Sequence, residues 1–233
     1  MIFSLEALYA LYMITNDGYS EDLFLLPLPE RAEEEKLEQL QQVLEKGYED
    51  LKSMDLIDES NEPTTACMAR GLYLEQYQKA ISHCEVDQRY YCAQLVDSNS
   101  WYHIVIEKVD DNAFTLKRIH SLQFLGMTIQ LHDFLSGQHP VRDTNPLASS
   151  WESYSHERLL IYYREKPALN VLTYSARKRS TAYLYLEAPS GIYQYDMMKQ
   201  QIRSLNTEEM KKEIIKQLKV RIEPCQRLVF SLP

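Results

Sequence analysis

Short strand candidates joined by tight turns constrain the fold of this chain more than any other feature. Ala113–His120 alternates apolar and polar side chains, and Trp101–Val109 places Ile104 and Ile106 on one face, since successive side chains of a strand point to opposite sides. Asp110-Asp111-Asn112 between these segments has the composition of a tight turn. The pattern therefore predicts neighbouring antiparallel strands.

Similar strand candidates recur later in the chain, and helical patterns flank both sets. The other predicted strands are Arg89–Val96, Asn170–Ala176, Thr181–Glu187 and Gly191–Tyr195, with Gln226–Leu232 as a further candidate. Helical spacing of apolar residues predicts helices over residues 3–14, 30–54, 64–83, 122–135, 151–163 and 206–219, although Leu159–Tyr163 also fits a strand. Each half thus contains a helix, three strands and a helix.

This order of elements predicts an α+β fold. We expect a central antiparallel sheet made of two quasi-repeated halves, with helices packed on it and an N-terminal helical segment. The 233 residues are predicted to form a single domain, 1–233, with pseudo-halves at about 1–135 and 147–233. Gly137 and Pro140 mark residues 136–146 as the linker.

Charge is unevenly distributed along the chain. The first 62 residues hold 16 of the 34 acidic residues and 4 of the 25 basic ones. Such an acidic segment argues against nucleic acid or an anionic membrane as its partner, and a solvated helix face is its simplest explanation. No apolar run approaches the ~18 residues of a spanning helix, and no signal peptide is evident, so we expect a cytoplasmic protein.

Motifs of enzymes and metal proteins are missing from the sequence. There is no G-x-S-x-G, no phosphate-binding glycine loop, no C-x-x-C and no H-E-x-x-H. We therefore predict no catalytic residue, no cofactor and no metal site, and we expect Cys67 and Cys92 to be reduced core thiols. The 17 tyrosines fit either a protein interface or simple strand propensity.

Taken in order, the chain resembles the EspG-like chaperones of type VII (ESX) secretion, in particular their Gram-positive relatives. The matching segments at the start are Phe3–Leu11, the proline-bearing Leu23–Pro29, Leu51–Asp58 and Asn61-Glu62-Pro63. Those in the body and at the end are Tyr90–Val96, Trp101–Glu107, Phe114–His120, Ala182–Glu187, Ser190-Gly191-Ile192-Tyr193 and Leu205–Leu218. Two departures are the absence of the family's glycine around Met54 and Ile192 in place of its arginine.

The resemblance implies a non-catalytic cytosolic chaperone or adaptor. It would bind a helical type VII secretion substrate and keep it soluble and competent for export. Substrate contacts in that family involve a loop between early sheet strands and a C-terminal helical region, which match the Asp110–Asn112 turn and the surface around Met197–Ser204 and the last helix here. The implied partner-binding residues are Asp110, Asp111, Asn112, Met197, Met198, Gln201 and Ser204.

Three other interpretations of the sequence remain open. The protein could be another binding module, such as an immunity protein that neutralises a toxin with its acidic N-terminal half. It could be an enzyme of unfamiliar type if a deep pocket held two or more of His103, His120, Glu107 and Asp133. Finally, the basic cluster Arg177-Lys178-Arg179 lies near tyrosines and could bind single-stranded nucleic acid, although a charged hairpin turn explains it more simply.

Overall fold

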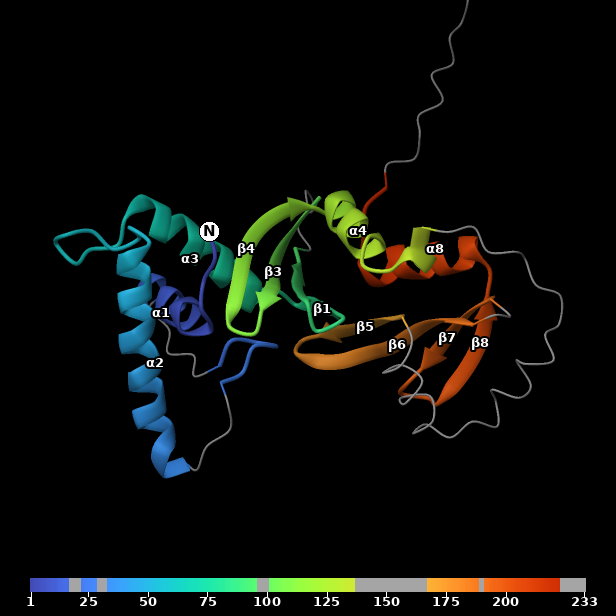
Figure 1. Ribbon diagram of the computed structural model, residues 1–233, viewed down its shortest axis with the longest axis horizontal. Helices are drawn as coiled ribbons and strands as arrows, with labels where there is room; N and C mark the ends of the chain where they lie inside the picture. Colours follow the sequence, from blue (N-terminus) through green and yellow to red (C-terminus); the bar gives the residue numbers. More distant parts are fainter. Residues whose placement is uncertain (17–21, 29–32, 96–100, 137–166, 189–190, 223–233) are drawn as a thin grey trace, which may run out of the picture.

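The computed structural model describes residues 1–16, 22–28, 33–95, 101–136, 167–188 and 191–222. Its centre is an eight-stranded, fully antiparallel sheet with helices packed against it, which confirms the predicted α+β class (Figure 1). The strands are β1 Ser82–Val86, β2 Tyr90–Gln94, β3 Tyr102–Asp110, β4 Ala113–His120, β5 Ala168–Ser175, β6 Lys178–Ala188, β7 Gly191–Asp196 and β8 Gln201–Leu205. The helices in these ranges are α1 Leu5–Thr15, α2 Glu33–Ser53, α3 Thr65–Lys79, α4 Ser121–Ile129, α5 Asp133–Ser136 and α8 Thr207–Gln217.

The sheet consists of two four-stranded meanders that meet in the middle. The strand order is β4-β3-β2-β1-β5-β6-β7-β8, so β1 and β5 are the central pair, and β4 and β8 are the two edges. A helix follows each edge strand directly: α4 follows β4, and α8 follows β8. The quasi-repeat itself stays a prediction, because residues 147–166, which would hold the opening helix of the second half, lie outside the described residues.

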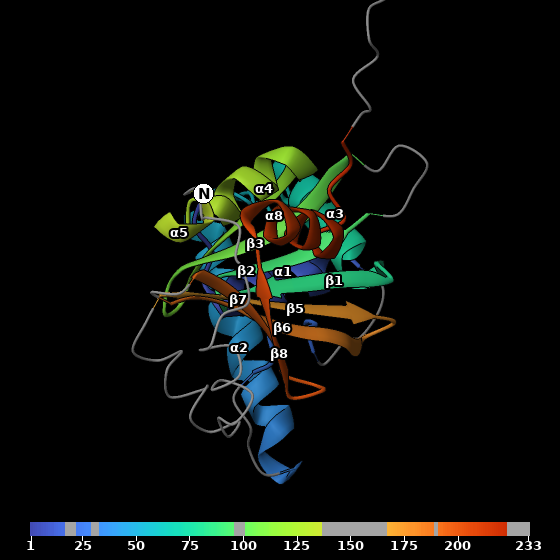
Figure 2. The same ribbon diagram turned by 90° about the vertical axis from the view of Figure 1, so that its right-hand side faces the viewer.

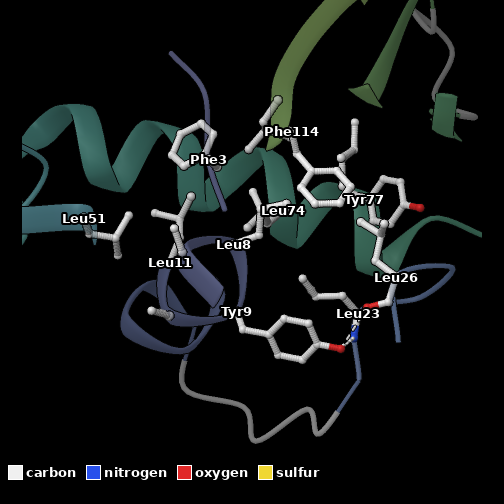
Figure 3. Close-up of a cluster of buried hydrophobic side chains, with 14 of the residues drawn as sticks. Phe3, Leu8, Tyr9, Leu11, Leu23, Leu26, Leu51, Leu74, Tyr77 and Phe114 are labelled. Atoms are coloured by element: carbon white, nitrogen blue, oxygen red, sulfur yellow. Dashed lines mark hydrogen bonds between the residues drawn. The ribbon is translucent and has the colours of Figure 1, made fainter. Parts of the chain in front are cut away.

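One apolar core joins the three N-terminal helices to the first half of the sheet. Tyr77 of α3 and Leu8 of α1 pack with Phe114 of β4, and all three are buried (Figure 3). The Tyr9 hydroxyl donates a hydrogen bond to the Leu26 carbonyl (2.9 Å). This bond fixes the segment 22–28 beside α1, and the cluster buries one face of β2, β3 and β4.

A second core lies on the opposite face of the sheet. There α4, α5 and α8 cover side chains such as Val105 of β3, Val171 of β5 and Tyr185 of β6. Figure 2 shows α4 and α8 on one side of the strands and α2 on the other. Ile104 and Val105, which are adjacent on β3, therefore belong to different cores, as strand geometry requires.

Capping side chains fix the starts of two helices. Thr64 caps α3 by accepting the Cys67 N–H, and Asn206 caps α8 by accepting the Glu209 N–H. The Glu209 side chain reaches back to the Asn206 N–H and completes a capping box.

The sequence-based prediction of secondary structure is wrong in three places. The helix predicted over 64–83 ends at Lys79, and its last residues belong to the central strand β1. Strands β1 and β8 were not predicted, so each half has four strands instead of three. The helix predicted over 122–135 is two helices, α4 and α5, and the break coincides with a 2.7 Å contact between His132 and the Asp87 carboxylate on the β1–β2 turn.

Other predictions fall outside the described residues: the linker 136–146 (beyond Ser136), the helix over 151–163, the strand Gln226–Leu232 and any role of Cys225. Within the described ranges, none of the helices combines the length and the apolar composition needed to cross a membrane.

Candidate functional site

The β3–β4 turn, which was predicted to bind a partner, is hydrogen-bonded to the start of α1. Asn112 Oδ1 accepts the Leu5 N–H (2.9 Å), and Asn112 Nδ2 donates to the Glu6 carboxylate (2.8 Å). Asp110 and Asp111 remain exposed. The turn therefore anchors the start of α1, while its two exposed carboxylates make local contacts: Asp110 accepts the Asp111 N–H (2.8 Å), and Asp111 pairs with Lys108 (3.4 Å).

The other predicted residues lie around the β7–β8 turn. Asp196 accepts the backbone N–H groups of Met198 and Lys199 (3.0 Å each), which closes the turn. Met198 is 55% exposed, and Gln201 and Ser204 are exposed on the edge strand β8. Met197 instead packs against a small cluster that includes Leu184, Leu186 and Tyr195.

The structure does not bring these two turns together. They lie at opposite ends of the strands and near opposite edges of the sheet, roughly 30 Å apart at the usual strand spacing. The Met197 cluster also lies on the sheet face away from α8. A single small partner element therefore contacts only one of them, and the last helix offers a separate surface.

That separate surface is an apolar groove between α4, α5 and α8, which we call the α4–α8 groove. Its volume is about 130 Å³. Lys211 is its only polar residue among the described residues that line it. The lining residues are Leu125, Ile129, Leu135, Met210, Lys211, Ile214 and Ile215.

The α4–α8 groove has a buried floor and a partly exposed rim. Leu135, Met210 and Ile214 are fully or almost fully buried, whereas Ile129 and Ile215 are half-buried. Figure 1 shows α4 and α8 side by side above the sheet. Leu122 extends the apolar surface along α4, since it lies three residues before Leu125 and is 47% exposed.

The sequence predicted the helices that carry the residues of this groove, but it did not predict that the helices lie next to each other. Leu125 and Ile129 lie in the helix predicted over 122–135, and Met210, Ile214 and Ile215 lie in the one predicted over 206–219. That α4 and α8 lie next to each other depends on the pairing of β1 with β5.

Three of the polar groups named for an enzymatic alternative, His103, His120 and Glu107, are engaged in structural contacts. Both nitrogens of the buried His103 imidazole contact main-chain oxygens: Nε2 that of Leu218 (3.0 Å) and Nδ1 that of Tyr102 (3.1 Å). His120 Nδ1 accepts the Leu122 N–H at the start of α4. Glu107 lies four residues along β3 from His103, roughly 13 Å away.

The Glu107 carboxylate is buried and pairs with two bases whose side chains are about half exposed. Arg89 and Lys117 each donate to its carboxylate at 3.0 Å. Burial alone would raise the pKa of Glu107, but the hydrogen bonds from Lys117 and Arg89 outweigh it and leave the pKa below its ordinary value. For His103, burial lowers the pKa. The contacts of His103 and Glu107 are therefore those of residues that stabilise the fold.

The described part of the chain contains no assembled site for thiol or metal chemistry. Cys67, Cys84 and Cys92 are free and buried, as the sequence predicted for Cys67 and Cys92. Burial raises the pKa of Cys67 and of Cys92, which disfavours the reactive thiolate. No group of three or more histidine, cysteine or acidic side chains that could hold a metal ion occurs among the described residues.

Comparison with known proteins adds no relative. No family model matches the sequence, and no curated protein matches it significantly.

Proposed function

We propose that this protein is a cytoplasmic chaperone or adaptor that binds a helical substrate of a type VII secretion system and keeps it soluble for export. The observation that carries the proposal is the α4–α8 groove, an apolar surface between two helices. Grooves of this kind accept the apolar face of an amphipathic helix through residues spaced at i, i+3 or i+4, and i+7.

The size of the groove supports one anchoring side chain from such a helix. Its volume of about 130 Å³ is similar to that of apolar cavities that hold one benzene ring, about 150 Å³. Burying one large apolar side chain contributes about 1.5–3 kcal/mol. Leu122 and Ile129 lie on the same side of α4 as Leu125 and would contact the flanking positions of the helix.

The experiment is co-expression with candidate substrates, followed by co-purification. The Ile129→Glu variant places a charge on the rim of the groove, and we expect it to reduce recovery of the complex more than tenfold. The matched control is Leu72→Glu on α3, which is 49% exposed and outside the groove, and it should leave the complex intact. Full binding by Ile129→Glu would contradict the proposal.

The immunity-protein alternative makes a different prediction. Exposed glutamates such as Glu45 and Glu38 lie on α2, so a basic toxin bound there would dissociate as salt is raised. Complexes held by the apolar groove should persist. Binding that is lost at high salt and unaffected by Ile129→Glu would favour the alternative.

A further inference from the structure

A pocket on the opposite side of α8 has a different chemistry. It lies where the last turns of α8 pack over the ends of β1, β5 and β6, and its volume is about 180 Å³. The groove uses Met210, Ile214 and Ile215, whereas this pocket uses Glu213, Lys216 and Gln217. The two sites therefore lie on different faces of one helix.

Two ammonium groups give the pocket a positive character. Lys216 forms no ion pair with any residue that the structure describes, and Lys219 Nζ donates to the Ser82 hydroxyl at 2.6 Å. The one carboxylate in the lining, Glu213, already pairs with Arg203 at 3.3 Å. The pocket thus has two lysines whose charge no lining carboxylate balances.

A buried amide, that of Gln217, borders the same space. Gln217 is 7% exposed and lines the pocket. Neither Nε2 nor Oε1 of its side chain makes a hydrogen bond in normal geometry within the described residues, although the Tyr185 hydroxyl lies near it. Leaving a buried amide unpaired costs about 1–3 kcal/mol, and a ligand with polar atoms would recover that cost.

Hydroxyl groups form the facing wall. Thr173 Oγ1 on β5 contacts Ser180 Oγ at 2.8 Å and Thr181 Oγ1 at 2.6 Å on β6. Hydroxyls both donate and accept hydrogen bonds, so this wall suits a ligand that carries hydroxyls of its own.

We propose that the pocket binds a small hydroxylated anion, a polyol that carries a phosphate or a carboxylate group. The anionic group would pair with Lys216 and Lys219, Gln217 would hydrogen-bond one of its oxygens, and the threonine and serine hydroxyls would bind the polyol end. The volume equals roughly six water molecules, which sets the size of the ligand. This inference is independent of the chaperone proposal.

Calorimetric titration of the full chain with three probes tests the class of ligand. Glycerol 3-phosphate and glycerate carry the anionic groups, and glycerol lacks one. We expect saturable binding of at least one anion that weakens as salt is raised, and no binding of glycerol at the same concentration. No saturable binding of either anion at about 10 mM, or equal binding of glycerol, would overturn the proposal.

Variants test the site. Lys216→Met and Lys219→Met should each weaken anion binding by about tenfold, whereas Lys212→Met, an exposed lysine on the same helix outside the pocket, should not. Gln217→Leu should weaken binding without lowering the melting temperature, because it replaces an unpaired amide with an apolar group of similar size. Equal effects of Lys212→Met and Lys216→Met, or none from either pocket lysine, would assign the anion to another place and overturn the proposal.

Discussion

At the residue scale, Gly47 allows α1 and α2 to cross closely. A Cβ added there would lie 2.1 Å from the Glu6 carbonyl oxygen and 2.8 Å from the Ala10 Cβ. Alanine is the better helix former by about 1 kcal/mol, but such a clash with backbone cannot be relieved by rotating a side chain. We therefore expect Gly47→Ala to lower the free energy of unfolding by about 2 kcal/mol or more, measured by urea denaturation.

Gly126 is the matched control. It lies inside α4, and an added Cβ would have no neighbour within 4 Å. Gly126→Ala should therefore stabilise the protein by about 0.5–1 kcal/mol. Equal effects of the two substitutions would show that helix propensity, and not the packing of α1 on α2, governs position 47.

A second residue-scale prediction concerns Glu107 and acid. Since its pKa is lowered in the folded state, its ion pairs stabilise the protein above the pKa of the unfolded chain, and that stability is lost as pH falls through the folded-state value. At pH 7, Glu107→Gln should cost about 1–2 kcal/mol. Urea midpoints should converge with the wild type near pH 3. Asp111→Asn, at an exposed site, should change the midpoint little at either pH.

At the element scale, the capping box sets the start of α8 and thereby both faces of that helix. Asn206→Ala removes the acceptor for the Glu209 N–H and should cost about 1 kcal/mol, which corresponds to a fall of about 2–4 °C in melting temperature. Asn206→Ser keeps an acceptor and should retain most of the stability. A melting temperature unchanged in Asn206→Ala would mean that packing of Met210 and Ile214 alone positions the helix.

At the scale of the whole molecule, the pairing of β1 with β5 makes the two meanders depend on each other. Five residue pairs, from Ser82 with Ser175 to Val86 with Val171, join them. Separating the halves would expose the edges of two central strands, which invites aggregation. We expect fragments 1–136 and 167–233 to be insoluble when expressed alone and to form a soluble complex together, as measured by sedimentation of the lysate. Soluble, folded fragments would contradict this expectation.

Local pattern determined much of this protein. Strand β4 was predicted with its observed ends, Ala113 and His120, because a half-polar strand on an edge shows clear alternation. The caps at Thr64 and Asn206 are equally local, since a side chain that caps a helix acts within a few residues. These features depend on short-range geometry, which the order of residues alone contains.

Tertiary structure decided the rest. Ser82–Val86 carries no alternation, because both of its faces are covered, and it becomes a strand only through β2 and β5 on its two sides. That central pairing determines the separation of the β3–β4 and β7–β8 turns, the α4–α8 groove, and the pocket lined by Lys216 and Lys219. The β1–β5 contacts join residues about ninety positions apart. Such contacts leave no periodic pattern in the sequence, yet they determine where these surfaces lie.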